Sequence, residues 1–268
     1  MQWTPGGPSS DLEDRRSSSG GGGFGFGGMH IGIGGAIVLL ILSLVFHRNF
    51  FALLGGNAGT PAQTAQRPVQ ETPEEHREVQ FVSFVLDDAQ ATWEKTLPRY
   101  RHAKLVLFRD AIDSACGFAQ AASGPFYCPE DEKVYIDLGF YDELRQRFGA
   151  PGEFAQAYVI AHEIGHHVQK LLGTEARGKQ DSVRLELQAD CYAGVWGHST
   201  QQRGIIDNAD ITQGLNAAAA IGDDRLQRMA GRTVNPESFT HGSSAQRVEW
   251  FRRGLESGRV EDCDTFGR

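Results

Sequence analysis

The longest apolar stretch of the chain lies near its beginning. Residues 29–54 contain an uncharged run from Met29 to Phe46, followed closely by further phenylalanines and leucines. About 20 apolar residues in a helix cross the hydrocarbon core of a bilayer, so we predict one transmembrane helix here, with the lipid bilayer as its partner. Residues 1–28 are polar and then almost pure glycine, which predicts a disordered segment. Residues 55–77 are rich in Gly, Ala, Gln, Thr and Pro and are typical of a linker.

Two other interpretations of the apolar run are a cleaved signal peptide and a buried helix of a soluble domain. A signal peptide begins closer to the N-terminus, and no small-residue cleavage site follows this run cleanly. A soluble helix has capped ends, whereas this run has glycine-rich flanks. We therefore expect a retained, single-pass anchor. Basic residues do not decide its orientation, because Arg15 and Arg16 precede the run and Arg48 follows it.

The pattern after the linker predicts one globular domain over residues 78–268, of mixed α+β class and mainly helical. An amphipathic helix is expected over residues 81–93. Alternating apolar residues predict a small β-sheet, with strands at 104–108, 126–128 and 133–137. Helical periodicity then continues to the end of the chain and predicts helices at 139–148, 153–172, 181–200, 210–230 and 243–256.

Charge and composition narrow the classes of partner. The 268 residues carry a formal net charge of −8, and 40% of them are hydrophobic. A surface that binds phosphates needs an excess of basic residues, so nucleic acid is not an expected partner. The hydrophobic content is sufficient for a substantial core in one domain. Oligomeric state does not follow from the sequence.

Four cysteines stand in the expected domain, and none belongs to a Cys-x-x-Cys pair. Cys116 and Cys128 bracket a glycine- and proline-containing segment that can turn back on itself, so we predict a disulfide between them. Cys191 would then pair with Cys263. The alternative is four buried free thiols. Disulfides form in oxidising compartments, so we expect the C-terminal domain to lie outside the cytoplasm, on the periplasmic side.

The most specific chemical pattern is His162-Glu163-Ile164-Gly165-His166, inside the helix predicted for residues 153–172. Residues four apart lie on one face of a helix, so both imidazoles can reach one metal ion. Glu163 lies beside that face and can act as a general base. Two surface histidines on an amphipathic helix would give the same motif by chance, so a third ligand is needed to strengthen the interpretation.

Glu186 and Asp190 supply that third ligand and a supporting carboxylate. They are four residues apart in an otherwise apolar helical segment, where carboxylates need a specific role. A catalytic zinc site has three protein ligands and one open position. We therefore predict one Zn²⁺ ion held by His162, His166 and Glu186, with Asp190 accepting the free N–H of a ligating imidazole.

Other candidates are less specific. His167 lies about 100° around the helix from His166, so it is not expected to be a ligand. An oxyanion donor could come from His241, Tyr158 or Tyr192, of which we favour His241 as a second catalytic residue. The strand at 134–137 could pair with an extended peptide substrate.

These motifs resemble the gluzincin metallopeptidases, which carry His-Glu-x-x-His and Glu-x-x-x-Asp on two helices. The whole chain is similar to one bacterial group, the neutral zinc metallopeptidases. The resemblance rests on the glycine-rich start before an apolar helix and on the stretches 114–117, 124–129, 134–137, 161–169, 186–194, 221–224 and 239–247.

The resemblance implies a zincin-like fold and peptide bond hydrolysis by a zinc-activated water. It also implies that His162, His166 and Glu186 are ligands, that Glu163 is the catalytic acid/base, and that the substrates are peptides or proteins. The alternative is a non-catalytic, zinc-stabilised and membrane-tethered binding or scaffold protein. The presence of Glu163 disfavours this alternative, because a structural zinc site needs no general base.

Overall fold

The computed structural model describes residues 1–17, 71–121, 124–175 and 178–267. The predicted anchor at 29–54 and most of the predicted linker lie outside these ranges. No helix within the described ranges is both long and apolar enough to cross a membrane.

Helix α2 (Pro73–Thr96) opens the part of the body that follows the undescribed segment. Thr72 and Glu75 form a capping box at its N-terminus, and Pro73 occupies the first turn, where its missing N–H has no cost. These signals start the helix eight residues earlier than the apolar periodicity predicts. Its inner face buries a row of large side chains, among them Val82, Val85, Leu86, Ala89 and Trp93.

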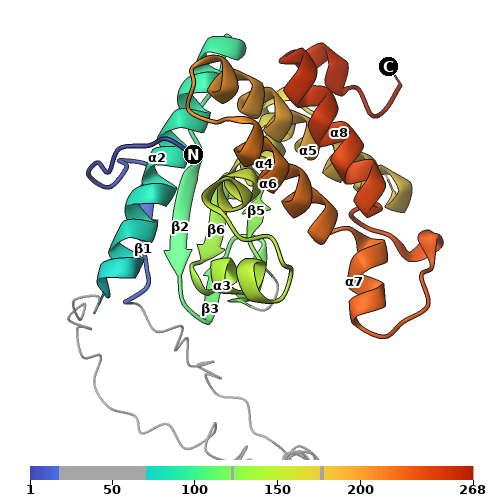
Figure 1. The fold of residues 1–268 in the computed structure, drawn as a ribbon, viewed down its shortest axis with the longest axis horizontal. Helices are drawn as coiled ribbons and strands as arrows, with labels where there is room; N and C mark the ends of the chain where they lie inside the picture. The colour runs from blue at the N-terminus through green and yellow to red at the C-terminus, as the bar shows by residue number, and fades with distance from the viewer. Residues whose placement is uncertain (18–70, 122–123, 176–177, 268) are drawn as a thin grey trace, which may run out of the picture. The chain divides into compact units, whose positions relative to one another are not determined.

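A four-stranded sheet lies beside α2 in the order β1-β2-β6-β5 (Figure 1). Its strands are β1 (Leu12–Asp14), β2 (Lys104–Phe108), β6 (Lys133–Asp137) and β5 (Phe126–Cys128). Strand β1 pairs parallel to β2, β2 pairs parallel to β6, and β5 pairs antiparallel to β6. The three strands expected from the sequence are present.

Strand β1 corrects the expected disorder of residues 1–28, since residues 1–17 belong to the folded body. The expected domain at 78–268 is accordingly too short, because it omits β1 and the first turn of α2. The glycine run that suggested disorder begins after this segment. A three-residue strand is too short to produce a recognisable alternation, and this is why the pattern did not reveal it.

The two faces of the sheet pack against two different hydrophobic cores. Leu105, Leu107, Val134 and Ile136 pack into the main core with the helices. The alternate residues Val106, Phe108 and Tyr135 face a second, smaller core. This second face lies against an antiparallel hairpin that the sequence did not predict, formed by β3 (Ala111–Ser114) and β4 (Gly117–Gln120).

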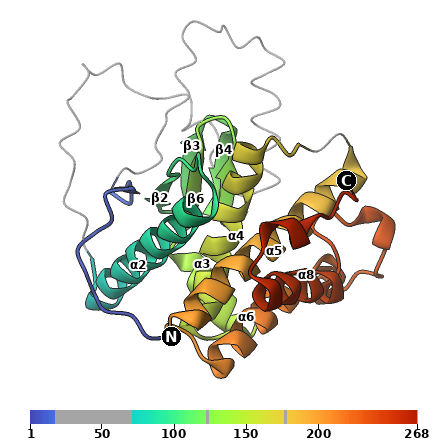
Figure 2. The same cartoon turned by 90° about the horizontal axis from the view of Figure 1, so that it is seen from above.

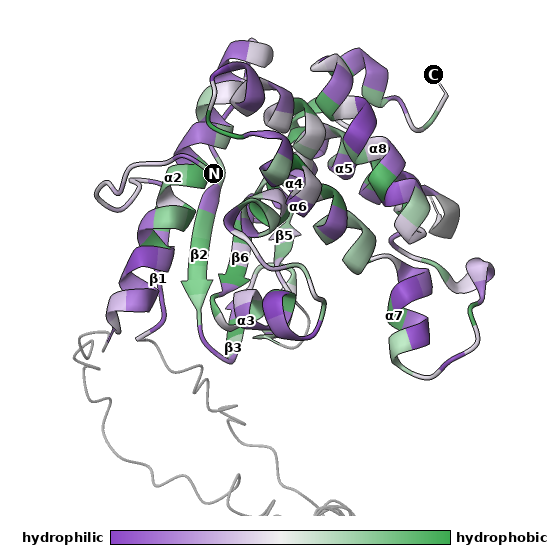
Figure 3. Cartoon of the chain, in the orientation of Figure 1, coloured by the Kyte–Doolittle hydropathy of each residue, from purple (hydrophilic) through white to green (hydrophobic). Residues whose placement is uncertain are grey.

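The remaining helices form a bundle on the other side of the main core. They are α3 (Gly139–Gln146), α4 (Glu153–Leu172), α5 (Lys179–Gln202), α6 (Asn208–Ala220), α7 (Asp223–Met229) and α8 (Ser244–Ser257). Figure 2 shows α5, α6 and α8 side by side, away from the hairpin β3–β4. The hydropathy colouring places apolar residues on the central strands and polar residues on the outer turns of α2 and α7 (Figure 3).

The single helix expected at 210–230 is wrong, because the chain breaks between α6 and α7. Gly222 packs so closely on α8 that an added Cβ would lie 2.3 Å from the backbone nitrogen of Ser244. The carboxylate of Asp224 accepts hydrogen bonds from the backbone N–H and the hydroxyl of Ser244. This tertiary contact fixes the break, which helical periodicity alone does not reveal.

Two disulfides join the cysteines in the predicted pairs. Cys116 and Cys128 have Cα atoms 5.8 Å apart, and Cys191 and Cys263 have Cα atoms 5.5 Å apart. The first bond joins the hairpin region to β5, and the second ties the C-terminal tail to α5.

Candidate metal centre

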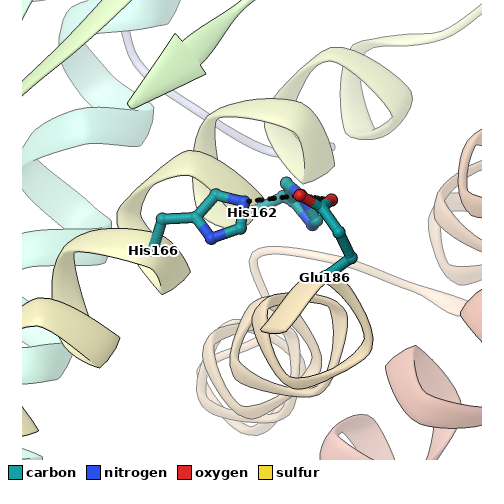
Figure 4. A group of neighbouring side chains, drawn as sticks. All are labelled: His162, His166 and Glu186. Atoms are coloured by element: carbon teal, nitrogen blue, oxygen red, sulfur yellow. Dashed lines mark hydrogen bonds and ion pairs between the residues drawn. The ribbon is translucent and has the colours of Figure 1, made fainter. Parts of the chain in front are cut away.

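Helix α4 presents both motif histidines toward α5. The helix ends at Gly173, which has the left-handed φ of 71° that favours glycine at a helix C-terminus. His162 and His166 lie one turn apart, with ring centroids 4.8 Å from one another. Figure 4 shows both rings turned toward the side chain of Glu186.

Glu186 of α5 completes a three-atom group with these rings. Its carboxylate oxygens lie 3.2 Å from His162 Nε2 and 3.6 Å from His166 Nε2. Two ligands bound tetrahedrally to zinc at about 2.1 Å lie roughly 3.4 Å from each other. Because the observed separations match this spacing, the three side chains are suited to one zinc ion, and among the described residues they form a group that could hold a metal ion.

Gly165 allows the two helices to approach closely enough for this geometry. A Cβ at this position would lie 2.9 Å from the carbonyl oxygen of Ala189 in α5. This distance is shorter than the contacts that Cβ atoms make in proteins. The glycine within the motif therefore sets the distance between the histidine-bearing and glutamate-bearing helices.

Each histidine is held by a partner on its Nδ1 atom. His162 Nδ1–H donates to Asp190 at 2.9 Å, and His166 Nδ1–H donates to the side-chain oxygen of Gln169 at 2.9 Å. A donated Nδ1–H leaves the Nε2 lone pair free to bind a metal. Both rings are thus fixed in the orientation and tautomer that zinc requires.

Asp190 lies at the centre of a fully buried polar cluster. It accepts two hydrogen bonds from Arg247, each of 2.9 Å, and one from the hydroxyl of Tyr158. Burial alone would raise the pKa of Asp190, but Arg247 and His162 outweigh burial and lower it. Burial likewise lowers the pKa of His162, and the Asp190 carboxylate reverses this, raising it to about 9. A metal ion would replace the proton that these groups hold.

Gln169 is itself oriented by α5 and the C-terminal tail. Its amide nitrogen donates to the carbonyl oxygen of Leu185 at 2.7 Å and to Gln188 at 3.1 Å. Gln188 in turn donates to the carbonyl oxygen of Cys263 at 3.0 Å. These bonds identify the amide oxygen of Gln169 as the atom that faces His166, so this side chain acts on His166 as Asp190 acts on His162.

His167 has no place among the ligands, as the sequence predicts. Its Nε2–H donates to the carbonyl oxygen of Arg101 at 2.6 Å, and its Nδ1 accepts from the hydroxyl of Tyr127 at 3.0 Å. Both ring nitrogens are therefore engaged, and burial lowers the pKa of the ring. The role of His167 is to tie α4 to β5 through Tyr127.

A cleft of about 960 Å³ opens above the three metal-binding side chains. It is lined by His162, Glu163, His166, Glu186, His241 and Arg247, together with a largely apolar group of Phe126, Tyr127, Phe140, Phe148, Val159, Ile221, Leu226 and Met229. The cleft thus joins the predicted general base, the predicted ligands and a hydrophobic wall.

The edge of the sheet at this cleft is β5. The sequence assigned substrate pairing to the strand at 134–137, but that strand is β6, which has β2 and β5 on its two sides. Phe126 and Tyr127 of β5 line the cleft, and within the described part of the chain β5 has a neighbouring strand on one side only. Substrate pairing at 134–137 is therefore wrong, because that strand has no unpaired edge.

His241 lines the same cleft and is paired with Asp223. Its Nδ1 lies 3.2 Å from Oδ1 of Asp223. The other carboxylate oxygen of Asp223, Oδ2, accepts hydrogen bonds from the backbone N–H groups of Thr240, His241 and Gly242. The hydrogen bond to Asp223 raises the pKa of His241. The two tyrosines considered as alternative oxyanion donors have other roles. Tyr158 donates its hydroxyl hydrogen bond to Asp190, and Tyr192 packs in the core against Trp93.

The structure therefore brings together every side chain that the sequence nominated for the site, and adds three that it did not. Gln169 bonds His166, Arg247 bonds Asp190, and Asp223 bonds His241. Gln169 could have been found from its position three residues after His166. Arg247 and Asp223 are distant in sequence from their partners, and no local pattern links them.

An HExxH helix beside a helix that contributes a glutamate defines a zinc-site architecture of the metallopeptidase kind. The family described as "Putative neutral zinc metallopeptidase" matches residues 1–266, and the chain belongs to this family. The family implies zinc and, as substrates, peptides or proteins.

The chain is also similar to proteins of other bacteria. The chain is 46% identical over 285 residues to "Uncharacterized protein YpfJ" of Escherichia coli (strain K12), covering 100% of this chain and 99% of that protein. It is 43% identical over 198 residues to "Uncharacterized protein Rv2575" of Mycobacterium tuberculosis, covering 67% of this chain and 68% of that protein. No solved structure matches the chain significantly.

Proposed function

We propose that this protein is a zinc-dependent peptidase that hydrolyses peptide bonds with Glu163 as general base. The observation that carries the proposal is the convergence of His162, His166 and Glu186 at the spacing of a tetrahedral site, in the floor of a cleft that Glu163 also lines. A purely structural zinc site is closed by four protein ligands, whereas this group supplies three and faces a cleft.

The side chains around the cleft have separate roles in the proposed reaction. A bound zinc ion would polarise the scissile carbonyl and lower the pKa of the attacking water. Glu163 accepts the proton of that water and delivers it to the leaving amine. His241, held by Asp223, donates a hydrogen bond to the oxygen on which negative charge develops.

The cleft suits an extended peptide. A substrate strand can add to the unpaired edge of β5, where main-chain hydrogen bonds give affinity without reading sequence. Side chains of the substrate then reach the apolar wall that includes Phe140, Phe148 and Leu226. We expect a preference for a large hydrophobic residue next to the scissile bond.

The proposal includes attachment to a membrane through residues 29–54 and a body outside the cytoplasm. The uncharged run from Met29 to Phe46 supports attachment. The two disulfides support an oxidising compartment.

The test is Glu163→Gln in the full-length protein, because glutamine keeps the shape of the side chain and removes the proton acceptor. Zinc content should be unchanged, since all three ligands remain. Cleavage of a peptide library should fall by about 10²–10⁴-fold, the usual loss when a general base is removed. Glu249→Gln, a change at an exposed position of α8, is the matched control and should retain full activity.

Two results would contradict the proposal. Equal cleavage by zinc-loaded wild type and Glu163→Gln would exclude Glu163 as the base. A zinc-loaded wild type that cleaves no peptide of the library would favour the scaffold alternative.

A further inference from the structure

A relay of three hydrogen bonds connects His166 to the C-terminal tail. His166 Nδ1–H donates to Oε1 of Gln169 at 2.9 Å. Nε2 of Gln169 donates to Oε1 of Gln188 at 3.1 Å, and Nε2 of Gln188 donates to the carbonyl oxygen of Cys263 at 3.0 Å. In each bond the donor is on the side nearer to His166. The relay therefore has one direction, and it ends on an atom that can only accept.

Burial makes this direction matter. Gln169 is 3% exposed, Gln188 is 6% exposed and Cys263 is fully buried. If a buried amide turns over, its oxygen takes the place of its N–H₂ group and faces the lone pairs of the acceptor beyond it. A buried polar group without a partner is costly. The orientation of each amide therefore depends on the acceptor beyond it.

Two backbone carbonyl groups of different segments set the orientation of Gln169. The carbonyl oxygen of Leu185 accepts directly from Nε2 of Gln169 at 2.7 Å. The carbonyl oxygen of Cys263 acts through Gln188, whose amide oxygen faces Gln169 only while its nitrogen donates to the tail. If Gln188 turned over, its N–H₂ group would face the N–H₂ group of Gln169.

The second disulfide holds the tail at this position. Gln188 and Cys191 are three residues apart and lie on the same face of α5. The bond between Cys191 and Cys263 brings their Cα atoms to 5.5 Å, which places the carbonyl group of Cys263 against Gln188. Beyond it, the hydroxyl of Thr265 donates to the carbonyl oxygen of Arg184 at 2.8 Å. The tail is thus attached to α5 before and after Gln188.

The direction of the relay decides which nitrogen of a neutral His166 carries the proton. The amide oxygen of Gln169 favours the proton on Nδ1, which leaves the lone pair on Nε2. Nε2 is the nitrogen that faces Glu186, 3.6 Å away (Figure 4). If Gln169 turned over, its N–H₂ group would face Nδ1, and the proton would move to Nε2. That tautomer has no lone pair at the metal position.

We propose that Gln188 is a positioning residue of the metal centre, and that the disulfide Cys191–Cys263 acts on zinc binding through it. Together they hold Gln169 in the orientation that gives His166 its metal-binding tautomer. The proposal rests on the zinc site of the proposed function, but it does not depend on peptide hydrolysis. It gives the second disulfide a role in metal binding besides the attachment of the tail.

The first experiment measures the zinc affinity of the full-length protein by competition with a chelator. Gln188→Leu removes both hydrogen bonds and should lower the affinity on the order of 10-fold, as expected for loss of support behind a ligand. Gln188→Glu is the conservative variant. Ionised or protonated, it offers an acceptor oxygen to Gln169, so its affinity should stay close to that of wild type. Gln201→Leu, at an exposed position of α5, is the control.

Paired serine replacements test the disulfide in the same assay. Cys191→Ser with Cys263→Ser frees the tail and should lower zinc affinity to the level of Gln188→Leu. Adding Gln188→Leu to this pair should cause no further fall, because both changes remove the same connection. Cys116→Ser with Cys128→Ser removes the other disulfide and should leave zinc affinity unchanged.

The second experiment reads the tautomer of His166 in the metal-free protein, at a pH at which the ring is neutral. NMR spectra of the ring nitrogens distinguish a proton on Nδ1 from a proton on Nε2, and the signals absent from His166→Gln identify this ring. We expect the proton on Nδ1 in wild type and in Gln188→Glu. Gln188→Leu should show a second population with the proton on Nε2, which a loss of packing alone would not produce.

Three results would overturn the proposal. A wild-type affinity and tautomer in Gln188→Leu would show that the carbonyl group of Leu185 alone orients Gln169. Equal losses of affinity in Gln188→Leu and Gln188→Glu would assign the effect to packing. A further fall on adding Gln188→Leu to the serine pair would separate the disulfide from Gln188.

Failure of this proposal is distinguishable from failure of the proposed function. A wild type that binds no zinc would contradict the proposed function, and the tautomer of His166 in the metal-free protein would still support or overturn the role of Gln188. A zinc-loaded protein without peptidase activity would leave the expected affinities unchanged.

Discussion

Single residues set the orientation in which the two histidines can bind zinc. An imidazole that binds a metal through Nε2 carries its proton on Nδ1, and here Asp190 and Gln169 accept that proton's hydrogen bond from His162 and His166. A charged carboxylate serves the more deeply buried ring, and a neutral amide serves the ring at the mouth of the cleft. The difference makes His162 the stronger donor of the two.

Removal of either supporting partner should weaken the metal site without abolishing it. For Gln169→Leu and Asp190→Ala we expect zinc affinity to fall on the order of 10–100-fold, since each ring loses the bond that fixes its tautomer. Competition titration with a zinc chelator measures the change. Gln201→Leu, at an exposed position near the end of α5, is the control for Gln169→Leu. Unchanged affinity in Gln169→Leu would show that His166 is oriented without this amide.

Deprotonation of His241 should cause the fall in turnover that we expect at alkaline pH. Asp223 raises the pKa of His241, so the protonated donor persists above the usual pKa of about 6.5 and is lost as pH rises through the raised value. Turnover should therefore fall at alkaline pH in the wild type. His241→Gln should lower turnover by about 10²–10³-fold and should lack this limb. An alkaline limb that persists in His241→Gln would assign it to another group.

The sequence reveals residues whose function depends on local spacing. His162 and His166 are four residues apart, as are Glu186 and Asp190, so periodicity alone places each pair on one face of its helix and Glu163 beside the histidines. Arg247 could not be found in this way. It reaches Asp190 only because α8 packs against α5, which is a property of the tertiary fold.

At the scale of helices and strands, close approach through glycine determines the geometry of the site. Gly165 lets α4 approach α5. Gly254 does the same between α8 and α5, since an added Cβ there would lie 1.9 Å from the carbonyl oxygen of Cys191. The second contact holds α8 where Arg247 can reach Asp190. Two glycines therefore fix the positions of three functional helices.

Gly165→Ala tests this dependence. Alanine favours an isolated helix by about 1 kcal/mol, but the clash with Ala189 must move α5, at a typical cost of about 1–3 kcal/mol. We expect lower stability in denaturant and weaker zinc binding, because Glu186 moves away from the histidines. Gly197→Ala is the control, since its Cβ would meet no backbone atom within 4 Å among its nearest neighbours, only side-chain atoms of Leu255 at 3.0 Å and Phe154 at 3.7 Å. Zinc affinity equal to that of wild type in Gly165→Ala would show that the helices tolerate the shift.

The elements themselves were predictable where local signals mark their ends. Helix α4 has the predicted bounds, because Pro151 precedes its first turn and Gly173 terminates it. The hairpin β3–β4 was not predictable, since its four-residue strands carry little apolar alternation and depend on the small core around Phe108 for burial. The boundary between α6 and α7 depends on the contact of Gly222 with α8.

At the scale of the whole molecule, the body is assembled from two pieces of chain separated by residues 18–70. The predicted domain at 78–268 followed the usual assumption that a glycine-rich terminus contributes nothing to a core. Strand β1 instead covers the edge of β2, and an exposed strand edge is a site of aggregation. The N-terminal piece therefore protects the sheet as well as completing it.

A final prediction follows for fragments of the protein. Residues 71–268 alone should be less stable than the same residues joined to residues 1–17 through a short Gly/Ser linker, which the proximity of Arg16 and Glu71 permits. Full burial of a large apolar side chain contributes about 1.5–3 kcal/mol, and Trp3 and Leu12 are partly buried. We therefore expect a loss of about 2–4 kcal/mol on removing the segment. Urea denaturation of the two purified fragments measures the change in unfolding free energy.

Two variants of the linked fragment serve as controls. Trp3→Ala should lower the unfolding free energy by part of this difference, whereas Thr4→Ala, at an exposed position, should leave it almost unchanged. A fragment of residues 71–268 as stable as the linked form would mean that β1 adds nothing to the stability of the sheet.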